Sequence, residues 1–559
     1  MFQSQRDNPS NLTAVTPRLR PWALSATLLL FATLLLTAAL PACQQTPTAE
    51  TGEDQELVSK TALERDLSFE GMVYVSETAS DATILSAIQQ QTRSMFGPLR
   101  IANVSLAKRE LADIKIAATT KEPVTVVNPK LASQTKMQRV RYKYTDKGIA
   151  PKTMARKSSL ALGVLCGNYQ SQSARILKEC TANDKHDLDF ASDLWYVFDP
   201  SRNACRTAMN GEQKAIDTVR KAKAVVAGQV VQEELDRLYQ PVTVRLAPGK
   251  STSGQIWPEY SRLWAGGIEK DKIILALVNG EIDHPPPGQA HHVTDDSGYL
   301  EMMEEMEVIF KARPNLKITV TDPPMDLSKL TANGKSVTGA TFQQFVQWQL
   351  HDSGYPATIT TAADRLALRK AVGDALFKRW VTLEETVTVK IGSATARKVT
   401  IRINQFFGAS EANTPHKRAI GGADVILYNG HSYIGSGPWD PDLYSAAHFP
   451  KSYQIFFIDS CISYNYYNQD YFKLKANGSK DLETITNGLE SFAGGSGAGL
   501  GRFLVALIGG KQPSYLDLLT VAGSEGPAYD WGKDALRVVD GEVDNAYKPT
   551  VTPIVVTLP

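Results

Sequence analysis

The sequence has little cysteine, little histidine and no excess of charge of either sign. Its 559 residues include 5 Cys and 8 His, and 60 basic residues balance 59 acidic ones. This balance excludes a chain-wide electrostatic attraction to nucleic acid, so we expect no nucleic-acid partner. No Cys-x-x-Cys spacing is present, which argues against a structural zinc site. We expect neither a metal nor a cofactor.

Long apolar runs are also scarce, and one lies at the N-terminus. Arg18 and Arg20 precede an apolar run of about 18 residues that ends at Leu40. Leu40 is also the first residue of the sequence Leu-Pro-Ala-Cys43. A basic start, an apolar run and small residues before a cleavage point predict a secretory signal peptide over residues 1–42. The last four residues resemble a bacterial lipobox, which implies lipidation of Cys43. An uncleaved membrane-anchor helix is the alternative, because the run is just long enough to span a bilayer.

The segment after the signal peptide is polar. Gln44–Gln55 is rich in Gln, Thr, Pro and Glu, so we expect a flexible tether over residues 43–60. Gln44 rather than Asp after the lipidated Cys indicates the outer membrane. We therefore expect an exported protein that faces the periplasm and is anchored to the cell envelope through the lipid on Cys43.

Residues 61–250 are predicted to form an N-terminal α+β domain. Gly71–Ser76 and Gln138–Tyr144 are typical of strands, and Ile84–Met95 and Gln213–Leu238 of helices. We find no catalytic constellation in this region. After export its three cysteines meet an oxidising environment, so we expect one disulfide, with the pairing left open. They are Cys166, Cys180 and Cys205.

A second domain is predicted over residues 265–530, followed by an irregular tail over 531–559. An apolar strand at Lys272–Val278, an amphipathic helix at Ser297–Lys311 and a strand at Leu316–Val320 predict the opening of a parallel α/β sheet. The acidic side of this helix is expected to be a solvated face. It carries Glu301, Glu304, Glu305 and Glu307.

Two short apolar runs later in the chain end in chemically reactive residues. Val425–Tyr428 is followed by Gly430-His431, and Ile455–Ile458 by Asp459-Ser460-Cys461. A helical crossover fits between them, so the runs predict adjacent parallel strands with His431 and Cys461 side by side at their carboxyl ends. An imidazole beside a thiol generates the thiolate nucleophile and later protonates the leaving amine. The alternative is a buried structural Cys next to an unrelated His.

These two blocks resemble the caspase-like cysteine peptidases. Tyr428-Asn-Gly-His-Ser432, with Trp439 shortly after, is most similar to the gingipain and clostripain type. The resemblance implies a mostly parallel caspase-like sheet flanked by helices and a cysteine endopeptidase that acts on a protein or peptide substrate. It also implies that Cys461 is the nucleophile and His431 the general acid and base. The amides of Ser432 and Cys461 would then form the oxyanion hole.

The resemblance leaves specificity and activity open. Trp439, Asp440 and Asp459 are candidates for the substrate pocket, where the acids would favour a basic side chain. The family has Gly directly after the His, and Ser432 stands there in this chain. An alternative is therefore a catalytically inactive lipoprotein that acts as a binding or assembly module.

Two further motifs have alternative interpretations. Ser432 could be the nucleophile of a serine α/β-hydrolase, but that elbow requires Gly where Ile434 stands, and His448 follows too soon to complete the triad. The glycine-rich segment 494–501 does not match the dinucleotide fingerprint, so we expect a flexible loop beside the site. The aromatic segment 464–472 is expected to pack in the core or to line the substrate cleft.

Overall fold

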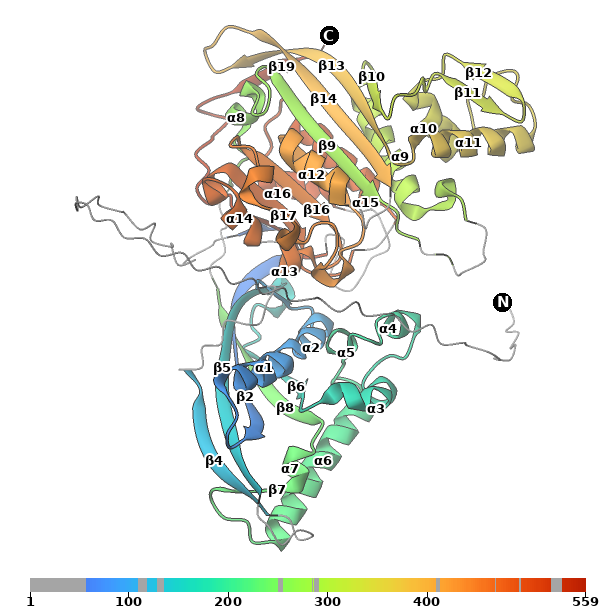
Figure 1. The fold of residues 1–559 in the computed structure, drawn as a ribbon. Coiled ribbons are helices and arrows are strands. Elements are labelled where there is room, and N and C mark those ends of the chain that lie inside the picture. The colour runs from blue at the N-terminus through green and yellow to red at the C-terminus, as the bar shows by residue number, and fades with distance from the viewer. Residues whose placement is uncertain are drawn as a thin grey trace, which may run out of the picture. The chain divides into compact units, whose positions relative to one another are not determined.

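The computed structural model describes residues 57–108, 118–127, 135–249, 255–283, 285, 291–408, 413–467, 469–491, 494–523 and 535–558, and Figure 1 labels their helices and strands. The predicted signal peptide, Cys43 and most of the predicted tether lie outside these residues. Within the described ranges, no helix is both long and apolar enough to cross a membrane. The described residues all belong to one compact unit.

The two apolar runs that precede His431 and Cys461 are neighbouring parallel strands, as predicted. They are β15 (Val425–Asn429) and β16 (Gln454–Asp459), and Asn429 pairs with Asp459 at their carboxyl ends. Every residue of both strands is buried, because helices cover both faces of the sheet.

These strands lie at the centre of a sheet with ten strands among the described residues. The order is β1 (Val58–Ser59), β18 (Arg537–Asp540), β17 (Leu482–Asn487), β16, β15, β9 (Lys272–Gly280), β14 (Arg397–Gly408), β13 (Arg379–Ile391) and β10 (Lys317–Asp322), with β19 (Ile554–Thr557) also on β13. The pairs from β17 to β14 are parallel and the remaining pairs are antiparallel. The sheet is therefore mixed, with a parallel centre.

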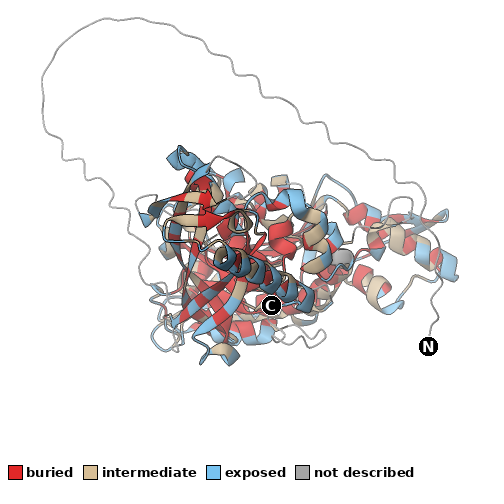
Figure 2. Cartoon of the chain, turned by 90° about the horizontal axis from the view of Figure 1, so that it is seen from below, coloured by how far each residue is buried: buried red, intermediate tan, exposed pale blue. Residues whose placement is uncertain are grey.

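Alternate residues of the central strands enter two separate cores. Leu427 and Phe457 face the core that holds residues of α9 (Ser297–Ala312), α15 (Ser496–Leu507) and α16 (Tyr515–Ala522). Ile426 and Phe456 face the core that holds residues of α12 (Asn413–Gly422), α13 (Ser463–Tyr467) and α14 (Asp470–Leu474). Figure 2 shows the buried residues concentrated in the strands, with exposed residues on the outer sides of the helices.

Three predictions about the ends of this sheet are wrong. The run Leu316–Val320 was expected to be a parallel strand, but β10 is an edge strand antiparallel to β13, and most of its side chains are exposed. The tail 531–559 was expected to be irregular, but β18 and β19 lie in it. Residues 57–60 are not a flexible tether, because Val58 and Ser59 pair with β18. Their distant pairing partners explain why local sequence did not reveal these strands.

A second, smaller sheet is built from the N-terminal part of the chain. Its order is β6 (Ser159–Leu165), β8 (Tyr239–Pro248), β2 (Ala62–Ser76), β5 (Thr135–Pro151), β4 (Thr120–Val127) and β7 (Gln229–Val231), with β3 (Ser105–Leu106) on β5. The helices of this part are α1 (Asp81–Arg93), α2 (Phe96–Ile101), α3 (Ser173–Glu179), α4 (Lys185–Asp189), α5 (Leu194–Val197), α6 (Asn203–Ala222) and α7 (Gln232–Leu235). The predicted strands and the first predicted helix are confirmed.

The predicted long helix over Gln213–Leu238 is only partly correct. Helix α6 begins ten residues earlier, at Asn203, and ends at Ala222. Ala224 and Gly228 then adopt positive φ angles of 45° and 77°, which end the helix and lead the chain into β7. The expected disulfide is present and joins Cys180 to Cys205, so α3 is tied to α6.

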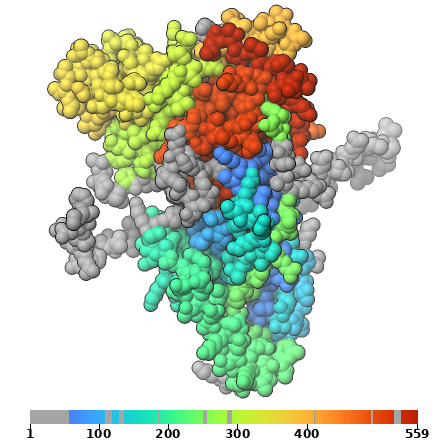
Figure 3. All heavy atoms as spheres, turned by 180° about the vertical axis from the view of Figure 1, so that it is seen from behind, coloured from blue at the N-terminus to red at the C-terminus, as the bar shows by residue number. Residues whose placement is uncertain are grey.

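The connection between β10 and β13 forms its own small lobe. It contains the hairpin of β11 (Lys329–Ala332) and β12 (Lys335–Thr338) and the helices α10 (Phe342–His351) and α11 (Ala362–Leu376). Figures 1 and 3 show these elements grouped together, in yellow, beside the main sheet. The short helix α8 (Tyr260–Ala265) buries Trp264 in the same core as residues of α9.

The N-terminal part packs against the carboxyl ends of the central strands. Ile149 of β5, Tyr464 of α13 and Leu489 after β17 share one buried cluster. Gly488 lies in the same contact, where an added Cβ would come within 2.4 Å of Ile149. The region that follows β15, β16 and β17 is therefore enclosed by both halves of the chain.

Candidate active site

His431 follows the end of β15 by two residues. Its Nε2 lies 2.7 Å from the carbonyl oxygen of Ile282, which follows β9 by two residues. A carbonyl oxygen only accepts, so Nε2 carries the proton and donates. The lone pair of the neutral imidazole is therefore on Nδ1, which is the state that a general base requires.

Cys461 follows the end of β16 by two residues, so it occupies the position equivalent to His431 on the neighbouring strand. Because β15 and β16 are parallel and in register, both residues lie just beyond the same edge of the sheet. Cys461 is half-buried and carries a free thiol. Its Sγ lies 3.4 Å from the carbonyl oxygen of Ser491 and 4.0 Å from the Ser491 hydroxyl.

The surroundings of Cys461 favour the neutral thiol. Burial raises its pKa to about 11, and the carboxylates of Glu490 and Asp459 add to this effect, while the contacts to Ser491 oppose it. The charge of Glu490 is fixed beside the site because Arg100 of α2 forms an ion pair with it and the Tyr196 hydroxyl donates to it. The thiol therefore needs a base to accept its proton when it reacts.

The backbone is strained beside both residues. Ile462, directly after Cys461, has a φ of 52°, and Tyr433 and Ile434, after His431, have φ of 48° and 52°. Left-handed conformations are rare for β-branched residues and cost about 1–3 kcal/mol each. Such strain is concentrated at functional sites, where the surrounding structure holds it.

The peptide units before Ser432 and Cys461 are held by hydrogen bonds to their carbonyl oxygens. The Tyr428 hydroxyl donates to the His431 carbonyl over 2.9 Å, and the Ser463 amide donates to the Ser460 carbonyl over 3.3 Å. In a trans peptide the N–H points opposite to the C=O. The amides of Ser432 and Cys461 therefore point away from these donors.

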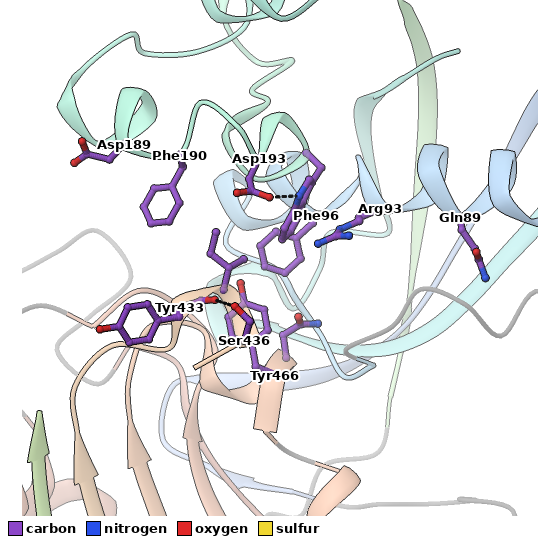
Figure 4. Close-up of a pocket in the computed structure, with 13 residues that line it drawn as sticks. Gln89, Arg93, Phe96, Asp189, Phe190, Asp193, Tyr433, Ser436 and Tyr466 are labelled. Atoms are coloured by element: carbon purple, nitrogen blue, oxygen red, sulfur yellow. Dashed lines mark hydrogen bonds between the residues drawn. The ribbon is translucent and has the colours of Figure 1, made fainter. Parts of the chain in front are cut away.

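A cleft of about 670 Å³ is lined by residues that follow His431 and Cys461 in the chain, from Tyr433 and Asn465 onward, and we call it the interdomain cleft. One wall comes from the N-terminal part of the chain and the other from the segments that follow His431 and Cys461, as Figure 4 shows. The first wall includes Arg93, Phe96, Asp189, Phe190, Asp193 and Trp195; the second includes Tyr433, Ile434, Ser436, Asn465 and Tyr466. Burial raises the pKa of Tyr466, and nearby groups that include Cys461 add to this effect.

The walls of the interdomain cleft are fixed by contacts among aromatic residues. Phe96 stacks on Tyr466 across the two halves, with 5.9 Å between ring centroids. The Arg93 guanidinium lies 4.2 Å above the Trp195 ring, whose Nε1 donates to Asp193 over 3.0 Å. The Asn465 amide donates to the carbonyls of Leu106 and Lys108, which binds α13 to the N-terminal part.

A row of buried polar side chains lies two residues before His431 and Cys461, at or next to the last positions of the central strands. Asn279 of β9 pairs with Asn429 of β15, which pairs with Asp459 of β16. Asn487 of β17 donates to Asp459, and Arg537 of β18 forms an ion pair with it over 3.1 Å. We did not predict this row, although each apolar run ends in Asn or Asp and gave a usable signal.

Helix α9 supplies carboxylates to the same row. Glu305 accepts from Asn279 over 3.0 Å, and Glu301 accepts from the Asn429 side chain and the Gly494 amide. Both carboxylates are buried, and burial raises the pKa of Glu301 to about 7 and of Glu305 to about 8. The prediction of a solvated acidic face on this helix is wrong for these two residues. Glu304 and Glu307 are partly exposed.

Two of the three predicted pocket residues are not available to a substrate. Asp459 is 1% exposed and is bound to Arg537 and Asn487. Trp439 is fully buried in the core between Tyr428 and Phe456. Asp440 is partly exposed, and its carboxylate accepts from the amide of Asp442 at the start of a short 3₁₀ turn.

The glycine-rich segment is not the flexible loop that we expected. From Ser496 it is helix α15, and its glycines allow this helix to approach α9 closely. A Cβ at Gly497 would lie 2.0 Å from the Glu301 carbonyl oxygen, and one at Gly501 would lie 2.8 Å from that of Glu305. Tyr467 and Tyr471 of the aromatic segment pack in the core, as one of the two expectations has it, and Tyr466 lines the interdomain cleft.

The surroundings of Ser432 do not form a hydrolase triad. Ser432 is buried, and its carbonyl accepts from the Tyr467 hydroxyl over 2.6 Å. His448 is bound instead to the amide of Ser445, over 3.0 Å. The backbone of Ser432 has a φ of −86° and a ψ of −18°, so Ser432 lacks the strained conformation of a nucleophile elbow.

In the described part of the chain, no group of three or more His, Cys, Asp or Glu residues is arranged to hold a metal ion. Comparisons with protein-family models, curated proteins and solved structures find no match to this chain. What the site does must therefore be inferred from its own geometry.

Proposed function

We propose that this protein is a caspase-like cysteine endopeptidase with His431 and Cys461 as its catalytic dyad. The observation that carries the proposal is the strand register: both residues stand two positions beyond paired residues of adjacent parallel strands. The hydrogen bond from His431 Nε2 to the Ile282 carbonyl supports it, because it leaves Nδ1 as the basic nitrogen.

The reaction follows from these positions. Nδ1 of His431 accepts the thiol proton while Cys461 Sγ attacks the substrate carbonyl carbon, and the carbonyl electrons move to its oxygen. The amides of Ser432 and Cys461 would donate to this oxyanion. Collapse expels the amine, which takes the proton from His431. Water then cleaves the thioester with His431 as base, and the free thiol returns.

The thiol environment determines how the dyad operates. Since the pKa of Cys461 is raised to about 11, the resting enzyme holds a neutral thiol and not a preformed thiolate. The proton must leave during the attack itself, so general base catalysis by His431 is essential. The interdomain cleft would receive the polypeptide, because it is open beside Tyr466 and the segment after His431.

We further propose that the protein is exported and held at the bacterial outer membrane by a lipid on Cys43. The disulfide between Cys180 and Cys205 supports export, since disulfides persist in oxidising compartments such as the periplasm.

The second candidate is an inactive caspase-like lipoprotein that binds or assembles with other proteins. The raised pKa of Cys461 favours it, as does Ser432, which is buried at the position after the catalytic His. Under this proposal the interdomain cleft binds a peptide without cleaving it.

Cleavage of an unbiased peptide library separates the candidates. The wild type and Cys166→Ala, which removes the other free thiol, should cleave at equal rates. Cys461→Ala should lose all cleavage, and His431→Ala should lose at least about 100-fold, the range for a general acid and base. Cleavage by Cys461→Ala at the wild-type rate would overturn the peptidase proposal, and peptide binding without cleavage by the wild type would favour the second candidate.

A further inference from the structure

Glu301 of α9 contacts both segments that carry the proposed catalytic residues. One carboxylate oxygen accepts from the side chain of Asn429, two residues before His431. The other accepts from the amide of Gly494, three residues after Ser491, whose carbonyl lies 3.4 Å from Cys461 Sγ. A single buried side chain therefore joins the end of β15 to the segment beside the thiol.

The neighbouring carboxylate on the same helix makes a different set of contacts. Glu305 accepts from Asn279 through Oε2, and its buried Oε1 has no hydrogen-bond partner in the described structure. Among the described residues, the hydrogen bond of its side chain therefore goes to β9 and not to the segment of His431 or that of Cys461. Glu301 and Glu305 are thus a natural pair for comparison: equal in chemistry, one turn apart and both buried.

We propose that Glu301 is a positioning residue whose ionised carboxylate holds the His431 and Cys461 segments in one arrangement. The effect of Glu301 on catalysis rests on the proposed peptidase function. Its contacts with the two segments do not depend on that function. An ionised carboxylate has two accepting oxygens, and here each has one N–H donor. A protonated carboxyl or an amide has only one oxygen suited to this, so one of the two segments would lose its anchor.

The charge environment of Glu301 makes this arrangement depend on pH. Burial raises the pKa of Glu301 to about 7, and the carboxylates of Asp459 and Glu304 act in the same direction. Glu301 in turn raises the pKa of Glu305. Cations on neighbouring elements are engaged elsewhere: Arg537 binds Asp459, and Arg502 of α15 donates to the carbonyls of Val521 and Gly523. His351 of α10 binds Glu307. Protonation near neutral pH therefore releases one segment.

Hydrogen exchange of the full chain tests the anchor without reference to activity. In Glu301→Gln, peptides that cover 429–432 or 494–497 should exchange about tenfold faster, since one buried hydrogen bond is lost. The wild type should show the same change below about pH 7, after correction for the intrinsic exchange rate, and Glu301→Gln should lose this pH dependence. In the same two segments, Glu305→Gln should exchange no faster than the wild type, because its amide oxygen still accepts from Asn279 and Glu301 keeps both of its donors.

Unchanged exchange in both segments of Glu301→Gln, or a pH dependence that survives the substitution, would overturn the proposal. A third readout links it to catalysis: Glu301→Gln should lower kcat with KM unchanged, and Glu305→Gln should keep the wild-type kcat. If the wild type cleaves no peptide but the exchange results hold, the peptidase function is wrong and the positioning role stands. If the wild type cleaves and Glu301→Gln has the same kcat, the positioning role is wrong.

Discussion

Cys461 is distinguished by the negative charge beside its thiol. Burial raises the pKa of Cys461 and Glu490 adds to this effect, and the ion pair with Arg100 keeps that carboxylate in place. Most activated cysteines have positive neighbours, which stabilise the thiolate. These surroundings favour the neutral thiol, so under the proposed function the reactivity of Cys461 would depend on His431 as base.

Replacing Glu490 by Gln should therefore lower the pKa of Cys461. The substitution removes a nearby negative charge and leaves the positive charge of Arg100 uncompensated, and both changes favour the thiolate. The pH dependence of Cys461 alkylation by iodoacetamide, read by mass mapping, measures the shift.

Glu77→Gln is the control, because Glu77 is exposed and lies in the N-terminal part of the chain. An unchanged midpoint of alkylation in Glu490→Gln would show that Glu490 does not govern the thiol.

At the scale of elements, the contact between α9 and α15 brings Glu301 to the site. Gly497 and Gly501 permit this contact because side chains there would overlap the backbone of α9. The close approach places the start of α15 against the carboxylate row and positions the Gly494 amide for Glu301.

Gly497→Ala should destabilise the protein by about 1–3 kcal/mol, the usual cost of overpacking, because the new Cβ would lie 2.0 Å from the Glu301 carbonyl oxygen. Gly211→Ala is the matched control. Gly211 lies inside α6 with no atom within 4 Å of an added Cβ, so Ala should stabilise that helix by up to about 1 kcal/mol.

Urea unfolding at constant pH measures both changes. Equal stabilities for the two variants would contradict the close contact between α9 and α15.

The elements that carry the candidate site were predictable from the sequence, and their surroundings were not. The apolar runs of β15, β16 and β9 are continuous because helices cover both faces, so local composition identified them. Glu301 and Glu305 were misplaced because helical periodicity assigns acids to solvent. Only the strand neighbours, Asn429 and Asn279, show that these carboxylates face inward.

At the scale of the whole molecule, the site is completed by distant parts of the chain. Arg100 and Tyr196 of the N-terminal part hold Glu490, and β1 and β18 close the edge of the main sheet. Such pairings join residues hundreds of positions apart, and no local pattern indicates them. The predicted boundary between two domains therefore describes the two sheets but not the candidate site, to which both parts of the chain contribute.

The stability of the whole molecule should fall as pH rises through the neutral range, in part because of Glu305. Its pKa is raised to about 8 by burial, above an ordinary value of 4.5, so the folded state binds more protons between these pH values. The free energy of unfolding of Glu305→Gln should equal that of the wild type below about pH 4.5. Toward pH 8 the variant should become the more stable of the two. The expected gain is a few kcal/mol, at about 1.4 kcal/mol for each unit of pKa difference.

Urea unfolding of both proteins at pH 4.5, 6 and 8 measures this difference. Glu304→Gln serves as control, because Glu304 is only half-buried on the same helix. A stability difference that does not grow with pH would show that Glu305 is not a strained buried carboxylate.

The most direct test of the dyad is labelling by a substrate-like electrophile, a peptidyl acyloxymethyl ketone, at pH 7, with the modified residue mapped by mass spectrometry. We expect covalent labelling of Cys461 in the wild type and none in His431→Ala. Both proteins should react slowly with simple iodoacetamide, because the resting thiol is protonated. Equal labelling of Cys461 in His431→Ala, or labelling of Cys166 in place of Cys461, would contradict a catalytic pair of His431 and Cys461.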